Sequence, residues 1–349
     1  MTAYDWQQFD FSSHFVGDCD DTPPAAAVSW LQTIYAQPNA ELEALSGLRF
    51  QSGDSSILSC SVIICTYNRA TLLAQVLDSL AAQRPALGVD TEIIVVDNNC
   101  VDSTAAVVDA AAQDLPLRRV TEARQGLSHA RNRGVAEAVC ELVLFADDVL
   151  LDAHWLQAYR NAASGFVDAG FFGGRIRPYW PDGRPSWVHD ESMALLAGIF
   201  GCVDHGLDTR RYEPGEDSPV SANFAVRKQL FETLGVFDPH YGRSGQDLGR
   251  GEETAFLMKA QAAGFAGVYV GAAFCRHYVA PQRLRLAALY RYGIASAHAH
   301  RALRDPNAHG RVLGAVGYLV RGCVQLFKGR GDRFRQCVII AGIQIGLRR

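Results

Sequence analysis

Apolar residues follow two alternating patterns along the chain from Cys60 onward. Short runs rich in Val and Ile are each followed by a stretch in which apolar residues recur at helical spacing. The runs predicted as strands are 61–68, 92–97, 117–122 and 141–148. Three helices lie between them: the first covers 70–83, the second begins after a cap at Asp102 or Ser103, and the third covers 126–139. Strands that alternate with helices predict βαβ units, and therefore an α/β fold with a largely parallel sheet.

The chain changes character on either side of this block. One plausible helix lies near Ala26–Tyr35, and no recognisable chemistry precedes Cys60. After Gly165 we expect a strand with a loop, a strand, two helices and a further strand, at 171–188, 221–227, 228–235, 252–264 and 266–271. Only helices are expected from Pro281. We therefore divide the chain into an N-terminal extension, an α/β domain and a helical region, at 1–58, 59–280 and 281–349.

Polar side chains stand where three of the predicted strands end: Thr66–Arg69, Asp97–Asn99 and Asp147–Asp148. Parallel α/β sheets bind ligands beyond the carboxyl ends of their strands, so we expect these groups to gather along one edge. The turn after the first strand has no glycine and the chain has no Gly-Lys pair, which argues against the dinucleotide, S-adenosylmethionine-type and P-loop phosphate sites. A divalent metal held by Asp147 and Asp148 would neutralise a diphosphate instead.

Composition narrows the class of protein. Of the 349 residues 48% are hydrophobic and the formal net charge is −4, so the chain is neither disordered nor built to bind nucleic acid. Its nine cysteines form no CxxC pair, which favours buried thiols in a reducing cytosol. No signal peptide is recognisable, and the longest apolar stretches fall short of the ~20 residues that span a bilayer. We expect a cytoplasmic location, and peripheral contact with the inner face of the membrane is a second option.

Seven motifs follow one another between residues 57 and 284. They are SVIICTYNR (61–69), VVDNNCVDST (95–104), ARQGLSHARNRG (123–134), FADDVLLDAHWL (145–156), SANFAVRK (221–228), GRGEETAF (249–256) and RHYVAPQRL (276–284). In this order and spacing they resemble the family 2 glycosyltransferases. The resemblance implies a GT-A fold, a sandwich with a mostly parallel central sheet, here followed by C-terminal helices.

The same resemblance implies an activity. The enzyme would be an inverting, hexosyltransferase-type glycosyltransferase that depends on Mn²⁺ or Mg²⁺. It would move a sugar from a nucleotide-diphospho-sugar, with UDP-sugars favoured, to a hydroxyl group of a glycan or a lipid-linked acceptor. Polysaccharide or glycoconjugate biosynthesis is the setting that this implies, and no nucleic-acid partner is expected.

The resemblance also assigns a set of residues to the nucleotide-sugar: Thr66, Tyr67, Asn68, Arg69, Asp97, Asn99, Arg131 and Asp147. A carboxylate at a strand end, such as Asp97, can accept the N–H of uracil or a similar base. Other interpretations stay open. Asp97 lies in good turn chemistry, Thr66–Arg69 can be a simple polar loop, and Arg131 and Asn132 can belong to a solvated helix face.

Two neighbouring carboxylates at the end of a buried strand repel each other, and a cation makes such a pair tolerable. We assign Asp148 to the metal and Asp147 to the ribose or a shared contact. The family often has a third aspartate, where this chain has Val149, so the metal-binding member of the pair stays open. The alternative is a pair that caps the following helix. The resemblance implies that His277 completes the metal site or contacts phosphate, although a lone histidine is more often structural.

The segment 251–253, Gly-Glu-Glu, resembles the family's Gly-Glu-Asp, in which the second carboxylate is the catalytic base. Glu253 takes that place, with Glu252 and Asp247 as fallbacks. Acidic residues in a first helical turn also simply favour the helix dipole. Trp180 and Trp187 either line the sugar cleft or pack in the core.

The C-terminal residues 311–349 contain eight basic side chains and one acidic side chain between apolar helical stretches. This pattern suits the surface of an anionic bilayer, and the alternative is a helix that packs on the domain with its charges solvated. Two rival functions stay open. A nucleotidyltransferase would need a Gly-rich basic loop after the first strand, and a catalytically silent binding module would account for the departures from the family's acidic motifs.

Overall fold

The structure is a computed structural model. It describes residues 58–83, 87–88, 90–188, 197–213, 216, 219, 222–242, 251–303 and 312–347. The chain divides into one unit at Met1–Ser56 and a second at Ile57–Arg349, and all described residues belong to the second. The helix expected near Ala26–Tyr35 and the fallback base Asp247 lie outside the described residues.

The first half of the second unit has the predicted βαβ order. Its elements are β1 (Cys60–Thr66), α2 (Ala70–Ala81), β2 (Thr91–Asp97), α4 (Thr104–Ala111), β3 (Leu117–Thr121), α5 (Leu127–Glu137) and β4 (Leu142–Phe145). Strand β1 is central and pairs in parallel with both β2 and β4, while β3 pairs in parallel with β2. The register places Thr66 opposite Asp97. Because the strands are parallel, their carboxyl ends lie at the same edge of the sheet.

The second half turns the sheet into a mixed one. Its elements are β5 (Val149–Leu151), α6 (Trp155–Gly165), β6 (Ala169–Tyr179), α8 (Ala197–Phe200), β7 (Thr209–Arg211), β8 (Phe224–Arg227), α9 (Lys228–Leu234), α10 (Glu252–Ala262) and β9 (Ala266–Tyr278). Among the described residues the strand order is β3-β2-β1-β4-β8-β6-β9-β5, with β7 paired to β9. Strand β8 runs antiparallel to both of its neighbours.

Three elements differ from the sequence-based expectation, and one of them is the short strand β7, which was not expected. The strand expected to end at residue 271 continues to Tyr278, so His277 lies inside β9 and not beyond it. The short strand β5 was not expected, and it pairs antiparallel with the last part of β9, with Val149 opposite His277. A three-residue strand carries too little periodic signal to be detected, and the partner that stabilises it lies more than 120 residues away in the sequence.

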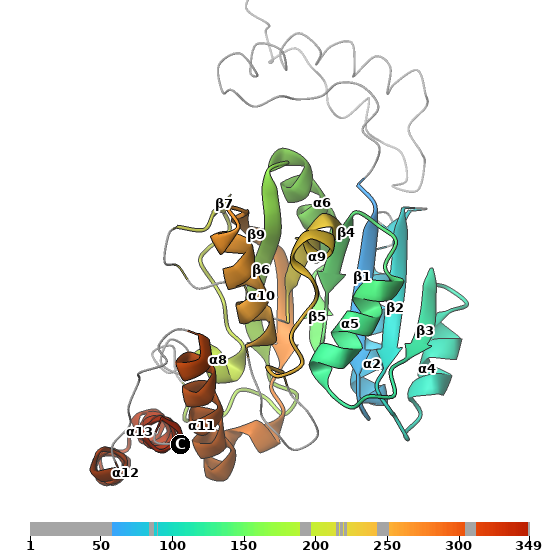
Figure 1. Cartoon of the computed structure of the whole chain (residues 1–349). Coiled ribbons are helices and arrows are strands. Elements are labelled where there is room, and N and C mark those ends of the chain that lie inside the picture. The colour runs from blue at the N-terminus through green and yellow to red at the C-terminus, as the bar shows by residue number, and fades with distance from the viewer. Residues whose placement is uncertain are drawn as a thin grey trace, which may run out of the picture. The chain divides into compact units, whose positions relative to one another are not determined.

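Helices cover both faces of the sheet (Figure 1). On one face α2, α4 and α6 bury residues such as Leu77, Val108 and Trp155. On the other face α5, α9 and α10 pack around aromatic rings, and Phe145 stacks on Phe224 with ring centroids 4.5 Å apart. The predicted α/β sandwich is therefore confirmed.

Helices follow β9, as expected: η3 (Pro281–Leu284), α11 (Leu286–Leu303), α12 (Val312–Phe327) and α13 (Gly331–Gly346). Helix α11 approaches α13 closely at two glycines, Gly293 and Gly342. An added Cβ at either position would overlap the backbone of the opposite helix. Residues of η3, α11 and α13 form a third apolar cluster with residues of 180–188 and 197–202, and Trp180 and Trp187 are half-buried in it. The structure thus supports core packing for both tryptophans. Among the described helices, none is both long and apolar enough to cross a bilayer.

Candidate active site

Three residues in the left-handed backbone region mark the ends of the three central parallel strands. Asn68 follows β1 with φ 51°, Asn99 follows β2 with φ 67°, and Asp148 follows β4 with φ 58°. They are the only residues other than glycine with positive φ in the part of the chain that the structure describes. Asn and Asp tolerate this conformation best, and residues held in it cluster at functional sites. The backbone therefore marks the edge of the sheet that the sequence singled out.

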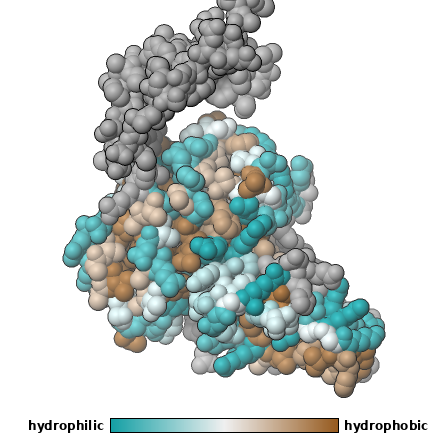
Figure 2. Space-filling model, turned by 180° about the vertical axis from the view of Figure 1, so that it is seen from behind, coloured by the Kyte–Doolittle hydropathy of each residue, from teal (hydrophilic) through white to brown (hydrophobic). Residues whose placement is uncertain are grey.

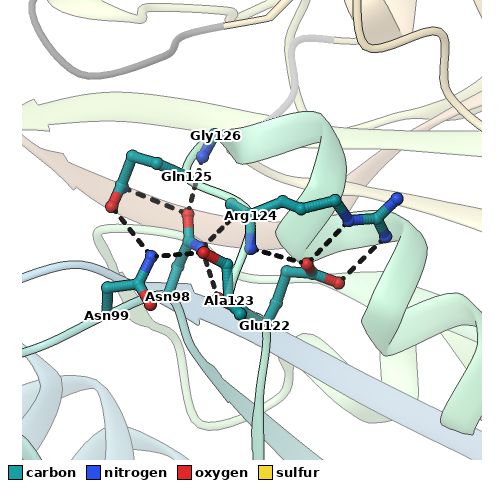
Figure 3. Close-up of polar contacts among 7 residues, drawn as sticks. All are labelled: Asn98, Asn99, Glu122, Ala123, Arg124, Gln125 and Gly126. Carbon is teal, nitrogen blue, oxygen red and sulfur yellow. Dashed lines mark hydrogen bonds and ion pairs between the residues drawn. The ribbon is translucent and has the colours of Figure 1, made fainter.

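The loop after β2 is tied to the segment 122–126 by Asn98 (Figure 3). The Asn98 amide group donates to the carbonyls of Glu122 and Arg124, both at 2.8 Å. Its Oδ1 accepts from the backbone N–H of Gly126 at 2.9 Å and from the side chain of Gln125 at 3.2 Å. Asn98 is buried and uses its full hydrogen-bonding capacity. The sequence interpretation placed this residue within the polar strand end 97–99 but gave it no role, although two adjacent asparagines after a strand are a recognisable turn signal.

Asp97 and its neighbours hold the loops after β1 and β2 together. Asp97 accepts the N–H of Cys100 at 2.8 Å, and its other oxygen pairs with the Arg119 guanidinium at 3.1 Å. The side-chain oxygen of Asn68 accepts the N–H of Val101 at 2.8 Å. The turn-forming interpretation of Asp97 is therefore present in the structure. The Asp97 carboxylate has further lone pairs, so these contacts are compatible with a hydrogen bond to a nucleotide base.

Asp102 and Asn99 complete this framework. Asp102 accepts the first N–H of α2, from Ala70, at 2.9 Å, and its other oxygen accepts from the Thr104 hydroxyl at 2.6 Å. The Asn99 side chain donates to the carbonyl of Ala123 at 3.0 Å. Of the residues assigned to the donor here, Thr66 is buried and Tyr67 is 48% exposed. The framework thus presents Tyr67 on the surface of a preorganised loop.

A buried arginine joins the two acid pairs of the site. The Arg131 side chain is 1% exposed, and it donates through Nη2 to Asp147 at 2.7 Å and through Nη1 to Glu252 at 2.7 Å. The second oxygen of Asp147 accepts the N–H of Cys65 in β1 at 2.7 Å. Burial disfavours the charged guanidinium, but the flanking carboxylates outweigh burial and hold the pKa of Arg131 above its usual value. A solvated helix face is therefore the wrong interpretation for Arg131.

The rings of Phe145, Phe224 and Phe237 surround the same guanidinium, with centroids 5.7–6.0 Å from its central carbon. Asn132, its neighbour on α5, exchanges hydrogen bonds with the backbone of Phe237 at 2.7 and 2.9 Å. Helix α5 is thus fixed by polar contacts on its buried side.

Asp148 and His277 lie next to each other on paired backbone segments. The carbonyl of Asp148 accepts the N–H of Tyr278 at 3.0 Å, and its carboxylate pairs with Arg69. Burial opposes ionisation of Asp148, but Arg69 and Arg283 outweigh burial, so the pKa of Asp148 lies below its ordinary value. The capping alternative is not what the structure shows, because α6 starts at Trp155 with His154 as its N-cap, and the carboxylate that accepts the N–H of His154, at 3.1 Å, belongs to Asp152.

The orientation of His277 leaves one ring nitrogen as an acceptor. Nδ1 lies 3.0 Å from the carbonyl oxygen of Phe200, which can only accept, so Nδ1 carries the proton. Nε2 therefore has a lone pair, which faces Arg283 at 3.4 Å. Such an arrangement is typical of a histidine ready to bind a metal through Nε2.

These two side chains fit a divalent cation with a partial protein ligand set. Within the described ranges no three His, Cys, Asp or Glu residues form a metal-binding group. Mg²⁺ is commonly held by one or two carboxylates together with substrate phosphates and water, and Mn²⁺ accepts both carboxylate and imidazole. Asp148 and His277 satisfy that requirement only if a bound diphosphate completes the shell.

The second acid pair opens α10. Gly251 precedes it with φ 104°, and a Cβ there would overlap the Leu303 side chain of α11. Glu252 is 3% exposed, and its burial together with the charge of Glu253 raises its pKa to about 7, although Arg131 opposes the shift. Glu253 is only half-buried. The pair is therefore divided into an inner carboxyl group held by Arg131 and an outer one.

A cavity of about 630 Å³ adjoins Arg69. The start of α2, Asp102, and a wall formed by Tyr179, Tyr278 and Gln282 line it. The cavity is large enough for part of a ligand of nucleotide-sugar size. Arg69 thus stands between this cavity and Asp148.

Comparisons with known proteins identify the family and the fold of the chain. The sequence model described as "Glycosyl transferase family 2" matches residues 61–235. The succinoglycan biosynthesis protein ExoM of Rhizobium meliloti strain 1021 is 25% identical over 307 residues, which cover 83% of this chain and 93% of that protein. The validoxylamine A glucosyltransferase of Streptomyces hygroscopicus subsp. jinggangensis is 37% identical over 108 residues, which are 30% of this chain and 25% of that enzyme.

Solved structures share the fold. The mannosyltransferase PcManGT of Pyrobaculum calidifontis, determined with GDP-Man and Mn²⁺, gives a TM-score of 0.55 at 20% identity over 92% of this chain and 96% of that one. TarS 1–349 of S. aureus, determined with UDP-GlcNAc, gives 0.51 at 18% identity over 80% and 82%. The architecture is that of the GT-A glycosyltransferases. The chain belongs to glycosyl transferase family 2, whose enzymes take their sugar from nucleotide-sugar donors.

Proposed function

We propose that this protein is an inverting, metal-dependent hexosyltransferase that moves a sugar from a nucleotide-diphospho-sugar, with UDP-sugars favoured, to an acceptor hydroxyl group. The observation that carries the proposal is the double ion pair of Arg131, which brings the acid pair at the end of β4 and the acid pair at the start of α10 to one place. A donor-side group and an acceptor-side group must meet in this way for a single displacement at the anomeric carbon.

The donor would lie along the edge formed by the ends of β1, β2 and β4. Its base would contact Thr66, Tyr67 and Asp97, and Asn68 and Asn99 would hold the loops that shape this part of the site. Arg69 pairs with Asp148 and also lines the neighbouring cavity. Its guanidinium would therefore turn from Asp148 to the diphosphate when the donor binds. Asp147 would contact the ribose, and its ion pair with Arg131 would fix the orientation of its carboxylate. Complexes of PcManGT with GDP-Man and of TarS with UDP-GlcNAc support a nucleotide-sugar here.

A Mn²⁺ or Mg²⁺ ion would be held by Asp148 and by Nε2 of His277. When bound, such an ion neutralises the charge that develops on the departing diphosphate. The protein prepares this position through the hydrogen bond from His277 to Phe200, which fixes the ring, and through Arg69 and Arg283, which keep Asp148 ionised.

Glu253 would act as the general base. It takes the proton of the acceptor hydroxyl as the oxygen bonds to the anomeric carbon, while the bond from that carbon to the diphosphate oxygen breaks on the opposite side, which inverts the configuration. Glu252 is held by Arg131 and buried, so it cannot serve this role without breaking the ion pair. Its place is to position the first turn of α10.

The acceptor would be a glycan or a lipid-linked glycan, and the setting would be polysaccharide or glycoconjugate biosynthesis. The likeness to ExoM, a succinoglycan biosynthesis protein, over most of both chains supports this setting. A membrane-proximal acceptor also agrees with the basic C-terminal region at 311–349 and with peripheral location at the inner face of a membrane.

The test has two steps, of which the first identifies the donor. Thermal unfolding is measured with UDP-, GDP- and dTDP-sugars, each with Mn²⁺ or Mg²⁺, and a cognate donor at 100 times its dissociation constant should stabilise the fold by about 2.7 kcal/mol. Release of pyrophosphate from a nucleoside triphosphate would favour a nucleotidyltransferase instead. Donor binding without hydrolysis or transfer would indicate a silent binding module.

The second step is the variant Glu253→Gln. Because a general base contributes about 10²–10⁴-fold, we expect transfer to fall by that factor, with the donor-dependent thermal shift unchanged. Glu232→Gln, an exposed carboxylate on α9, is the matched control. Full transfer activity in Glu253→Gln would remove Glu253 from the mechanism, and the configuration of the product, read by NMR, decides between inversion and retention.

A further inference from the structure

Helix α12 exposes an apolar face that no described element of the chain covers. The exposed side chains are Val316, Leu319, Val320, Cys323, Val324, Leu326 and Phe327. At 100° per residue these positions span about 160° of the helix circumference. Figure 2 shows the same feature as hydrophobic surface along the C-terminal helices, at the lower right. Phe327 alone is 93% exposed.

The opposite side of α12 accounts for how the helix is held. Ala315 and Gly322 are buried, and a Cβ at Gly322 would touch Cys337 and Phe334 of α13 at 3.1 Å. Helix α12 thus lies on α13 through small residues and turns its large apolar residues outward. A contiguous apolar face of this kind on a folded chain marks a surface that binds something.

Basic groups border this face. Arg321 stands at its edge, and Lys328 and Arg330, both exposed, follow directly after its C-terminal end. The one acidic residue of the region, Asp332, is buried. Apolar side chains on one face with cationic groups at the border match the interface of an anionic bilayer, where the former enter the acyl boundary and the latter meet the headgroups. The charge pattern therefore selects an anionic lipid surface as the occupant.

We infer that the outer face of α12 docks the enzyme on an anionic membrane surface and so presents its acceptor side to membrane-bound substrate. The link to the site runs through the neighbouring helices. Helix α12 packs on α13, α13 packs on α11, and Leu303 of α11 lies against Gly251, which precedes the Glu252–Glu253 pair. The role in acceptor presentation rests on the proposed function, whereas the docking itself does not.

The experiment is co-sedimentation of the full chain with extruded vesicles. We expect binding to vesicles of phosphatidylcholine with about one third phosphatidylglycerol, much weaker binding to pure phosphatidylcholine, and weakening as salt rises. The double variant Val320→Glu/Phe327→Glu should lower the partition coefficient at least about tenfold, because two apolar side chains no longer enter the bilayer. Lys328→Glu/Arg330→Glu should lower binding by about fivefold or more per residue on anionic vesicles only.

The control is Val167→Glu, which places the same charge at an exposed valine, 76% accessible, in the turn before β6. It should bind vesicles as the wild type does. Equal binding by Val320→Glu/Phe327→Glu and wild type, or no preference for anionic vesicles, overturns the inference. A wild-type dimer that becomes a monomer in this variant, without vesicle binding in either, overturns it in favour of a second copy. The donor-dependent thermal shift, measured on the same samples, reports separately on the proposed function.

Discussion

The acid pair Asp147–Asp148 after β4 and the acid pair Glu252–Glu253 at the start of α10 meet the same electrostatic difficulty in the same way. In each, two adjacent carboxyl groups would repel each other in a partly buried setting. In each, the inner member is buried and bound by Arg131, while the outer member is more accessible. One buried cation thus supports two pairs that lie far apart in the sequence. In the proposed mechanism the outer members are the ones that contact ligands.

The two pairs differ in what surrounds the outer member. Asp148 is flanked by Arg69 and Arg283, whose charges keep it ionised, and by His277. Glu253 lies beside Glu252, and burial together with the charge of Glu253 raises the pKa of Glu252 to about 7. The cations around Asp148 keep it negatively charged, which suits a group that binds a metal ion beside a phosphate. The second carboxyl group beside Glu253 favours uptake of a proton, which suits a general base. The comparison predicts which changes damage the fold and which damage only the chemistry.

The largest effect is expected for Arg131→Met. This change leaves Asp147 and Glu252 buried without their cation, and breaking a buried ion pair costs about 3–5 kcal/mol. The free energy of unfolding, from urea titration, should fall by that amount. Arg133→Met is the control, since Arg133 lies on the same helix with its side chain 42% exposed and its pair with Glu137 is worth about 0.3–0.5 kcal/mol. A loss for Arg131→Met no larger than that of the control would contradict the shared-cation interpretation.

Asp148→Asn and Asp147→Asn should separate the two members of the first pair. Loss of an outer-shell partner of a metal ligand lowers affinity about 10–100-fold, so loss of the ligand itself in Asp148→Asn should weaken metal-dependent donor binding by about 100-fold or more. Asp147→Asn should instead lower the free energy of unfolding. Isothermal titration with donor and Mn²⁺, alongside thermal unfolding, checks both. Identical profiles for the two variants would mean that the pair is not divided.

A smaller effect concerns the pH dependence of stability. The pKa of Glu252 is raised to about 7 from 4.5, so the folded chain holds this proton more tightly than the unfolded chain. The contribution of Glu252 to stability is therefore full below the lower value, declines as pH rises through the window, and is lost above about 7. Glu252→Gln should remove this decline, narrowing the difference in Tm between pH 5 and pH 8 by about 2–4 °C. An unchanged difference would show that Glu252 does not titrate in this window.

The smallest effect is expected for Arg69→Gln. This change frees Asp148 from a half-exposed ion pair worth about 0–1 kcal/mol, so binding of Mn²⁺ alone should tighten by up to about fivefold. Binding of the donor with Mn²⁺ should weaken, because the diphosphate loses its arginine. Arg118→Gln, an equally exposed arginine on β3, is the control. Tighter metal binding in both variants would indicate a general charge effect.

The sequence predicted the strand ends of the site well, because parallel strands bring consecutive carboxyl ends to one edge. Asp97 and the Asp147–Asp148 pair needed only that rule. Arg131 could be selected from its motif, but its burial could not, since the carboxylates that bind it lie 16 and 121 residues further along the chain. Non-local pairing of this kind leaves no periodic signal.

His277 and Asn98 show two other limits. The end of the last strand was placed before His277, because β5, its partner, is three residues long and is stabilised only by pairing with β9. Asn98 is fixed by carbonyl groups of the segment 122–126, and backbone acceptors carry no residue signature. Contacts made through the backbone, such as strand pairing and hydrogen bonds to carbonyl groups, therefore could not be predicted from the sequence here. The assignments of Glu253 to catalysis and of Asp148 to metal stay predictions.

The contact of Gly251 with Leu303 sets a condition on exchanging parts between related enzymes. Residue 251 has no side chain and a left-handed backbone, and the leucine of α11 fills the space that a Cβ would need. A chimaera that takes its C-terminal helices from another family member must therefore bring a side chain of matching size to that point. A larger one would push on the first turn of α10, and a smaller one would leave a void beneath it. The C-terminal helices therefore cannot be exchanged without matching the side chain that meets residue 251.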